Sequence, residues 1–241
     1  MNKINLPPIY WCKKCVLPSN AAITLNFNSD GVCSACQVQE QKKNIDWDER
    51  LKLLNEEIDP YRKPSGYECI IGVSGGKDSY YQVHFVKEKL GLNPLLVTFS
   101  PVIPTEIGSY NRQQLINLGF DQIFVAPNNK VAKILCRRFL EERGDPKIHW
   151  NAGINSTPLR VSIEKKIPLI FYAEHGDSQY GGNPINKESS KFKDLDEIYE
   201  NLIGDDPRNW IDEIITENDI FPYTVPDENL LKKNKTKAYF F

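Results

Sequence analysis

Residues 69–79 read CIIGVSGGKDS, and this stretch decides the fold. Its first part is a short apolar run of the kind found in buried parallel strands. The glycine-rich SGGKDS of residues 74–79 follows directly, and a helical pattern then runs from Tyr80 to about Leu90. Glycines let backbone N–H groups approach an anion, and a helix N-terminus adds the positive end of its dipole. The order of strand, glycine turn and helix therefore predicts a phosphate-binding loop.

The side chains of this loop suit the phosphates of a nucleotide. Ser74 and Ser79 offer hydroxyl groups, and Lys77 supplies a positive charge. Asp78 is expected to orient the loop or to help hold a metal ion. The spacing of the ordinary P-loop, G-x-x-x-x-G-K-[ST], is absent, so the sequence indicates another class of phosphate site. The alternative is a glycine turn that binds nothing.

Strand and helix patterns alternate through the rest of the central region. Short apolar runs predict strands at 95–99, 122–126 and 167–173, and helical spacing predicts helices at 106–118, 129–142 and 158–166. This alternation predicts an α/β fold with a doubly wound parallel sheet and right-handed crossovers. Ligands of such sheets bind at the carboxyl ends of the strands. Thr98 and Phe99 end the second predicted strand, so they are expected beside the phosphate loop.

The segment after Ala173 is expected at the same edge of the sheet. Residues 174–183 read EHGDSQYGGN, which is polar, glycine-rich and poorly suited to a core. A solvated connection is one interpretation, but the position after a strand favours a site. Glu174 and His175 are candidates to bind substrate, position Mg²⁺ or move protons.

The remaining histidines and two of the cysteines carry weaker signals. His84 is expected to be structural, and the role of His149 is open. Cys69 and Cys136 are interpreted as buried thiols.

Four of the six cysteines form two close pairs near the N-terminus. Cys12 and Cys15 form one pair, Cys33 and Cys36 the other, and seventeen residues separate the pairs. Two such turns present four thiolates in the tetrahedral arrangement that zinc prefers, and four ligands leave no open position for catalysis. A structural zinc ion is therefore predicted. The alternatives are two disulfides, four free thiols or an iron–sulfur cluster.

Length and composition set the broad class. The chain has 241 residues, a formal net charge of −2 and 26% charged residues, an ordinary globular mix. With a pI near 6.0, broad electrostatic binding to nucleic acid is not expected. No apolar run approaches the roughly 18–20 residues of a membrane helix, and the N-terminus has no apolar signal-peptide core. A cytoplasmic protein without a membrane partner is expected.

Four parts are predicted along the chain. They are a zinc-binding module at 1–45, a linker helix at 46–64, the α/β domain with the phosphate-binding loop at 65–185 and a helical extension at 186–241. Helical spacing over 192–217 is the main sign of the last part. A segment as short as the first part buries little core by itself, so the metal is expected to supply its stability.

The hexamer SGGKDS resembles the signature of the PP-loop ATP pyrophosphatases. The resemblance implies cleavage of ATP between its α- and β-phosphates, transfer of AMP to an oxygen atom, and displacement of AMP by a nitrogen or sulfur nucleophile. It also implies ATP and Mg²⁺ as cofactors. The ATP-binding residues expected are those of the hexamer, together with two that the predicted sheet places beside it. They are Ser74, Gly75, Gly76, Lys77, Asp78, Ser79, Thr98 and Phe99.

The whole chain resembles a narrower group, the N-acetyl sugar amidotransferases of surface-polysaccharide (lipopolysaccharide O-antigen) and nonulosonic-acid (pseudaminic and legionaminic acid) pathways. The segments that carry this resemblance are DGVCSAC, IGVSGGKDSYYQ, LVTFSP, NLGFDQIFVAPN, ERGDPK and IPLIFYAEHGDSQYGG. The resemblance implies conversion of the acetamido group of a nucleotide-linked N-acetyl sugar into an acetamidino group. It implies a separate glutaminase subunit that supplies ammonia. Members of the family continue well beyond residue 241, so a truncated gene product, a fragment or one half of a split protein is expected.

For that reaction, the predicted position of the two loops at one edge of the sheet assigns two sets of residues. The expected catalytic residues are Lys77, Asp78, Glu174 and His175, and the expected sugar-binding residues are Gly176, Tyr180, Gly181 and Gly182.

Two other functions compete with this interpretation. A tRNA-thiolating enzyme also joins zinc-binding cysteines to such a loop, but further cysteines near the site and a basic face are expected there. Only Cys69 and Cys136 lie outside the zinc module, and they are not paired. The other alternative is a truncated, non-catalytic remnant that binds ATP or a partner.

Overall fold

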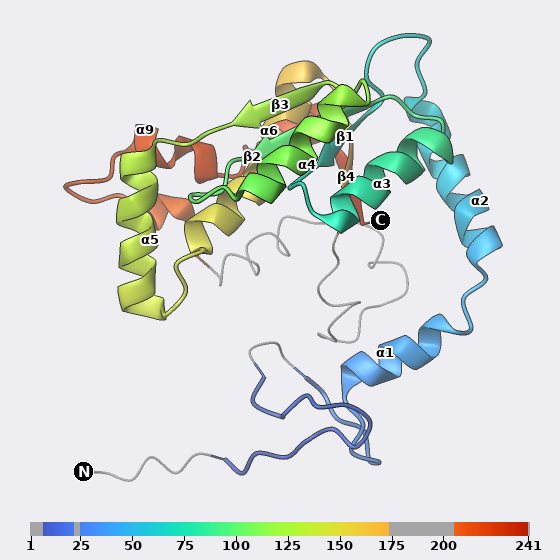
Figure 1. The fold of residues 1–241 in the computed structure, drawn as a ribbon, viewed down its shortest axis with the longest axis vertical. Helices are drawn as coiled ribbons and strands as arrows, with labels where there is room; N and C mark the ends of the chain where they lie inside the picture. The colour runs from blue at the N-terminus through green and yellow to red at the C-terminus, as the bar shows by residue number, and fades with distance from the viewer. Residues whose placement is uncertain (1–6, 22–24, 174–204, 241) are drawn as a thin grey trace. The chain divides into compact units, whose positions relative to one another are not determined.

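The computed structural model describes residues 7–21, 25–173 and 205–240 (Figure 1). These residues form two compact units. The smaller unit contains the described residues up to 56, and the larger unit contains 57–173 and 205–240. Each unit is described by itself.

The smaller unit is built around the cysteine pairs. Two isolated antiparallel bridges join Trp11 to Pro18 and Phe27 to Cys33. Helix α1 (Ser34–Lys42) follows the second bridge, and α2 (Trp47–Ile58) supplies the expected helix after the module. The Asp46 carboxylate caps α2 by accepting hydrogen bonds from two backbone N–H groups of its first turn.

The larger unit contains a sheet of five parallel strands in the order β3-β2-β1-β4-β5. The strands are β1 (Cys69–Gly72), β2 (Pro94–Phe99), β3 (Gln122–Val125), β4 (Leu169–Tyr172) and β5 (Lys237–Phe240). In the register of the central strands, Ile71 lies opposite Leu96 on one side and Phe171 on the other. The predicted α/β class with a parallel sheet is therefore confirmed.

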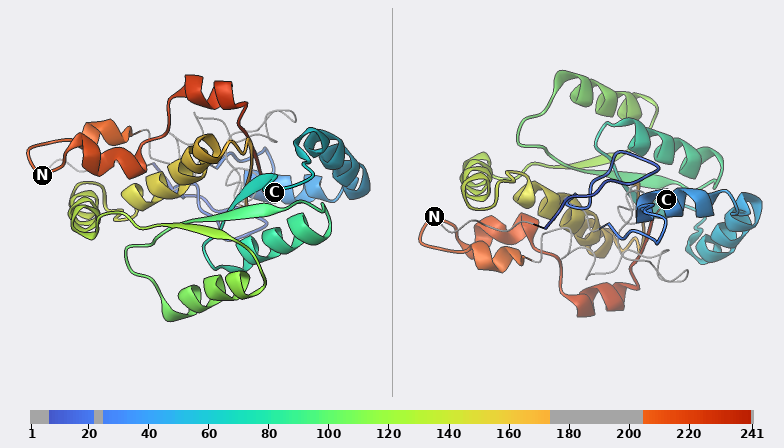
Figure 2. Two further views of the ribbon diagram at one scale, coloured as in Figure 1. Left: turned by 90° about the horizontal axis from the view of Figure 1, so that it is seen from above. Right: turned by 90° about the horizontal axis from the view of Figure 1, so that it is seen from below.

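Helices cover both faces of this sheet. Figure 2 shows α3 (Lys77–Glu88) and α4 (Glu106–Asn117) on one face, and α6 (Ile148–Lys165) and α10 (Glu228–Asn234) on the other. The chain passes from β1 through β2 to β3 and then returns by α5 (Asn129–Arg143) and α6 to β4, on the other side of β1. The direction of winding therefore reverses between β1 and β4, and ligands of doubly wound sheets bind at such a switch point.

Two apolar clusters can be traced among the described residues of the larger unit. In the first, β1, β2 and β4 pack against α6, with Ile70, Val97, Leu159 and Ile170 all nearly inaccessible. The second mixes aliphatic and aromatic residues and joins the end of β2 to α5 and to the C-terminal segment, with ring contacts among Phe99, Phe139, Trp210 and Tyr223. The side chain at the carboxyl end of β2 is thus packed into this cluster.

The structure differs from the sequence-based expectation at several places. Helix α6 begins at Ile148 rather than at residue 158, and Pro158 lies inside it. Proline is usual in the first turn of a helix and rare in the interior. Pro158 is therefore compatible with a helix that starts at residue 158, but the helix starts ten residues earlier.

The predicted helical extension is also corrected in its described part. The short helix η1 (Asp59–Tyr61) follows α2 and lies outside this segment. Residues 205–240 contain short helices only, followed by strand β5. These helices are η3 (Pro207–Trp210), α9 (Glu217–Ile220), η4 (Phe221–Tyr223) and α10. An apolar run of four residues does not distinguish a strand from a helix by periodicity, which is why β5 was not foreseen. Residues 186–204 lie outside the described residues.

A membrane span is not found in the part of the chain that the structure describes, where every helix is too short or too polar to cross a bilayer.

Candidate functional site

The SGGKDS hexamer lies where β1 passes into α3, at the switch point of the sheet. The N–H group of Val73 still donates to the Val97 carbonyl at 2.9 Å, so the ladder extends to the start of the loop. Helix α3 begins at Lys77, after Gly76 in the N-cap position. The second half of the hexamer is therefore the first turn of the helix, which the sequence pattern placed later, at Tyr80.

Gly75 is the position at which the loop requires glycine. Its φ of +87° lies in the left-handed region, and a Cβ atom there would lie 2.5 Å from the Gly108 carbonyl oxygen. The loop thus rests directly on the backbone of α4. The Asn111 amide, one turn further along α4, donates a hydrogen bond of 2.9 Å to the Gly75 carbonyl. The sequence reasoning missed Asn111, because nothing local to an exposed helix indicates a contact with a distant loop.

The two serines of the hexamer have different tasks. Ser79 is 5% exposed, and its hydroxyl donates to the Gly76 carbonyl at 3.0 Å while accepting from the Ser74 N–H. Ser74 is exposed, and its hydroxyl accepts from the Gly76 N–H at 3.2 Å. Ser79 therefore stabilises the loop from within, whereas Ser74 is accessible to a ligand.

Lys77 and Asp78 form an ion pair on the surface of the loop. The lysine Nζ lies 2.7 and 2.9 Å from the two carboxylate oxygens. The side chains are 86% and 56% exposed. Ion pairs this exposed contribute at most about 1 kcal/mol, so the ammonium group can turn to another anion at little cost.

The side chains of Thr98 and Phe99 are both buried. The Thr98 hydroxyl donates to the Val73 carbonyl at 2.7 Å and accepts from the Gln122 amide. The Phe99 ring is packed against Gly153, where a Cβ atom would collide with it, and makes an edge contact with Tyr223. Because both side chains are buried, these two residues could contact ATP only through their backbone atoms. Their part in ATP binding stays a prediction.

The buried side-chain amide of Gln82, near the loop, has no hydrogen-bond partner among the described residues that would explain its burial. Gln82 lies one turn after Ser79 on α3 and is fully buried, yet neither atom of its amide has a hydrogen-bond partner among the described residues. A buried amide without partners is destabilising by roughly 1–3 kcal/mol per group. Such groups are uncommon in native proteins, and nothing in the sequence indicated this one.

The predicted acceptor side of the site lies outside the described residues. The residues concerned are Glu174, His175, Gly176, Tyr180, Gly181 and Gly182. Strand β4, which ends at Tyr172, pairs with β1, so the chain leaves the sheet at the strand next to the one that carries the hexamer. The roles of these residues stay predictions.

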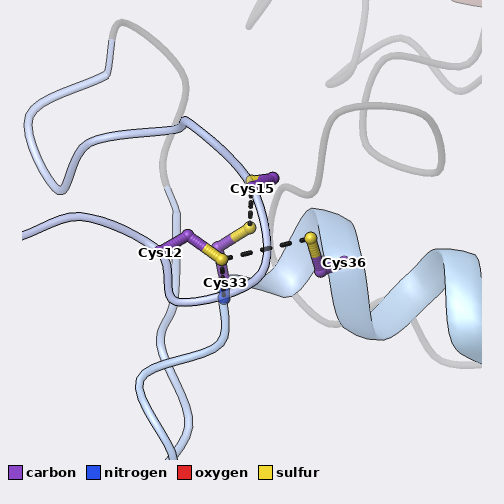
Figure 3. A group of neighbouring side chains, drawn as sticks. All are labelled: Cys12, Cys15, Cys33 and Cys36. Atoms are coloured by element: carbon purple, nitrogen blue, oxygen red, sulfur yellow. Dashed lines mark hydrogen bonds between the residues drawn. The ribbon is translucent and has the colours of Figure 1, made fainter.

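The four N-terminal cysteines gather into one cluster (Figure 3). All four sulfur atoms lie within 4.8 Å of one another. The Cys15 and Cys33 sulfurs are 3.6 Å apart, and those of Cys12 and Cys36 are 4.0 Å apart. A tetrahedron with zinc–sulfur bonds of about 2.3 Å has edges of about 3.8 Å, so the cluster has the dimensions of a zinc site.

The electrostatics of the cluster also suit a cation. Burial and the neighbouring sulfurs raise the pKa of the Cys36 thiol to about 12. Burial acts in the same direction on Cys12, but backbone N–H donors, first that of Cys33 and then that of Lys14, bring its pKa down to about 6. Thiolates gathered this closely repel one another, and a metal ion bound between them removes that repulsion. The group could therefore hold a metal ion such as zinc.

The two other cysteines play no part in either site. All six cysteines are free of disulfides. Cys69 is buried in β1, and burial raises the pKa of its thiol. Cys136 is half-buried on α5.

Comparison with known proteins gives partial matches. No protein-family model matches the chain. A stretch of 87 residues is 33% identical to an uncharacterized protein of Methanocaldococcus jannaschii and covers 36% of this chain but only 31% of that relative. Among solved structures, a predicted subunit of a tRNA methyltransferase from the same organism is 21% identical. The match covers 68% of this chain and 72% of the other, with a TM-score of 0.35.

Proposed function

We propose that this protein is an ATP-dependent amidotransferase, an AMP-forming ligase that converts the acetamido group of a nucleotide-linked N-acetyl sugar into an acetamidino group. The observation that carries the proposal is the position of SGGKDS, residues 74–79, at the switch point of the parallel sheet. There the loop presents an exposed serine, an exposed lysine and the N-terminus of a 12-residue helix to one region. This combination suits the β- and γ-phosphates of ATP.

The proposed reaction uses ATP to turn a poor leaving group into a good one. The amide oxygen of the sugar attacks the α-phosphorus, the bond from that phosphorus to the bridging oxygen breaks, and pyrophosphate leaves. Ammonia then attacks the amide carbon, and AMP leaves with the former amide oxygen as two protons are released. The amide oxygen thus ends in AMP, and the new C=N bond replaces the C=O bond.

Each residue of the loop has a role in this scheme. Ser74, Lys77 and the backbone N–H groups would bind the departing pyrophosphate, and Lys77 would stabilise the charge that grows on it. The exposed Asp78 carboxylate offers the oxygen ligand that Mg²⁺ prefers, and that ion would neutralise further phosphate charge when bound. Glu174 and His175 would act on the acceptor side, toward ammonia or the metal ion. The sugar would contact Gly176, Tyr180, Gly181 and Gly182.

The cysteine cluster has a structural role in the proposal. Cys12, Cys15, Cys33 and Cys36 would hold one zinc ion with no open coordination position, so the metal would fold its module rather than take part in the reaction.

A product assay tests the reaction class. The protein is incubated with ATP, Mg²⁺, ammonium and a panel of nucleotide-linked acetamido sugars, and the nucleotides and sugars are analysed by mass spectrometry. We expect AMP and pyrophosphate, together with a sugar in which an oxygen atom has been replaced by an NH group. Release of ADP and phosphate would refute the class. A thiolated RNA formed in a parallel assay would indicate a tRNA-thiolating enzyme, and binding of ATP without any product would indicate a non-catalytic protein.

The lysine of the loop allows a controlled test of the site. Lys77→Ala should lower turnover by about 10²-fold or more, because it removes charge stabilisation at the departing pyrophosphate. Its stability should change by less than about 0.5 kcal/mol, since the side chain is exposed. Lys87→Ala on the same helix is the matched control, because Lys87 is exposed and lies toward the other end of α3. Equal activity of both variants would remove Lys77 from the mechanism.

The nitrogen source and the acceptor side have separate tests. The isolated chain should use ammonium but not glutamine, and a glutaminase subunit should restore activity with glutamine at low ammonium. Direct use of glutamine by the isolated chain would contradict this. Glu174→Gln should stop amidine formation while ATP still binds; full activity of that variant would show that Glu174 is not catalytic.

A further inference from the structure

The phosphate loop is fastened to a helix that the proposed reaction does not otherwise use. We infer that Asn111 of α4 is a positioning residue, which turns the peptide between Gly75 and Gly76 so that its N–H group faces the bound pyrophosphate. The inference rests on the proposed function, because it concerns how the same loop binds ATP. The contact that carries it is the hydrogen bond of 2.9 Å from the Asn111 amide to the Gly75 carbonyl.

The orientation of this peptide follows from its planarity. The bond is trans, as are all the others that the structure describes, so the Gly75 carbonyl and the Gly76 N–H point in opposite directions. The carbonyl is directed to α4 by Asn111. The N–H is therefore directed away from α4, toward the inside of the loop, where it donates to the exposed hydroxyl of Ser74 at 3.2 Å. An anion that enters the loop meets an N–H group there rather than a carbonyl oxygen.

Without Asn111 the Gly75–Gly76 peptide loses the hydrogen bond that favours this orientation. Gly75 has no side chain, and glycine takes positive and negative φ values with nearly equal ease. The neighbouring Gly76 is also glycine and is exposed. A peptide between two glycines can rotate at low cost unless a contact fixes it. Rotation would present the Gly75 carbonyl oxygen to the phosphates and replace an attraction with a repulsion.

Helix α4 is well placed to be the fixed partner. The Thr105 hydroxyl caps its first turn by accepting from the Gly108 N–H at 3.1 Å. Gly108 is the residue whose carbonyl lies against Gly75. Asn111 is three residues after Gly108, so both contacts with the loop come from one face of one capped helix. The loop is therefore held by α4, the helix that follows β2, as well as by Ser79 of α3, the helix that the loop itself begins.

Two variants separate this role from a general effect on folding. Asn111→Ala removes the donor, and Asn111→Asp keeps the shape but places a carboxylate against the Gly75 carbonyl. The ligands are pyrophosphate, ATP and AMP, measured by calorimetry on the full chain. Gln113→Ala is the matched control, since the Gln113 amide lies on the same helix and donates to Asn117 rather than to the loop.

The expected result depends on the ligand. Asn111→Ala should weaken pyrophosphate and ATP by about tenfold, the effect of one misdirected hydrogen bond to a charged group, and Asn111→Asp should weaken them further. AMP lacks the β- and γ-phosphates, so both Asn111 variants should bind AMP with an affinity within about twofold of that of the wild type. Gln113→Ala should bind all three ligands normally.

The possible failures are distinct from one another. If the wild type binds pyrophosphate and both Asn111 variants bind it equally well, the inference is overturned and the proposed function stands. An equal loss for AMP and pyrophosphate also overturns it, because Asn111 would then only maintain the fold. If the wild type binds neither pyrophosphate nor ATP, the proposed function fails and takes the inference with it.

Discussion

The two units of this protein are stabilised in different ways. In the smaller unit the buried cluster consists of Cys12, Cys33 and Ala35, so sulfur atoms occupy the place of a hydrophobic core. The larger unit has clusters of eleven and ten buried residues, which are aliphatic and aromatic. A small segment cannot bury enough apolar surface to offset its loss of conformational entropy, whereas a sheet covered on both faces can. The smaller unit should therefore depend on a metal ion, and the larger unit should not.

The largest expected effect separates the units by removing the metal. The double variant Cys12→Ser, Cys33→Ser, or treatment of the wild type with a strong chelator, should release one zinc per chain and unfold the smaller unit. Zinc binding supplies on the order of 10 kcal/mol or more of folding free energy in modules of this kind. The larger unit should keep its cooperative thermal transition. Metal analysis measures the zinc content, limited proteolysis the unfolding of the smaller unit, and calorimetry the thermal transition of the larger unit.

Cys136→Ser is the control for this experiment, because Cys136 is a half-buried cysteine on α5 outside the cluster. It should leave the zinc content unchanged. Retention of a full equivalent of zinc by the double variant would disprove the four-cysteine assignment. Simultaneous loss of both transitions would show that the two units do not fold independently.

The second effect is a weakness inside the larger unit. His149 is 1% exposed within the aromatic cluster, beside Phe139 and Tyr223. Neither ring nitrogen makes a hydrogen bond of normal geometry with the described residues. Burial lowers the pKa of His149 to about 4, and only the nearby Pro146 backbone works against this shift. The folded state thus holds the ring neutral where the unfolded chain would protonate it.

The sign of the resulting pH dependence is fixed by that difference. The stability should be fully present above pH 6.5 and should fall as the pH is lowered from there to about 4, by on the order of 3 kcal/mol. Chemical denaturation at a series of pH values measures it. His149→Phe should flatten this part of the profile, while substitution of the exposed His84 by Gln should not. An unchanged profile in His149→Phe would show that other groups cause the acid sensitivity.

The smallest expected effect is a gain in the stability of the larger unit. Gln82→Met keeps the length of the side chain and removes an amide that has no partner among the described residues. The variant should be more stable by about 1–2 kcal/mol, which raises the melting temperature of a unit this size by several degrees. Gln113→Met, at an exposed position, is the control and should change stability by less than about 0.5 kcal/mol. A less stable Gln82→Met would show that the amide has a partner in solution.

Most of the sheet could be predicted because its signals are local. Strands β1 to β4 appear in the sequence as short apolar runs, and α3 to α5 as helical repeats between them. The strand ends differ from the prediction by three residues or fewer. The cysteine pairs carry an equally local signal, since a two-residue gap places both thiols of a turn on one side. Strand β5 was missed because its four residues belong to the sheet only by pairing with β4.

The sequence by itself determined the local features of each candidate site: a glycine turn between a strand and a helix, and two pairs of cysteines. Only the tertiary structure decided how the glycine-rich loop is held. The contacts of Asn111 and Gly108 with Gly75 join residues more than thirty positions apart, and the burial of Gln82 depends on what covers α3. The physical reason is that a periodic pattern reports only which face of an element is buried. Which atoms meet across that face is fixed when the elements pack together.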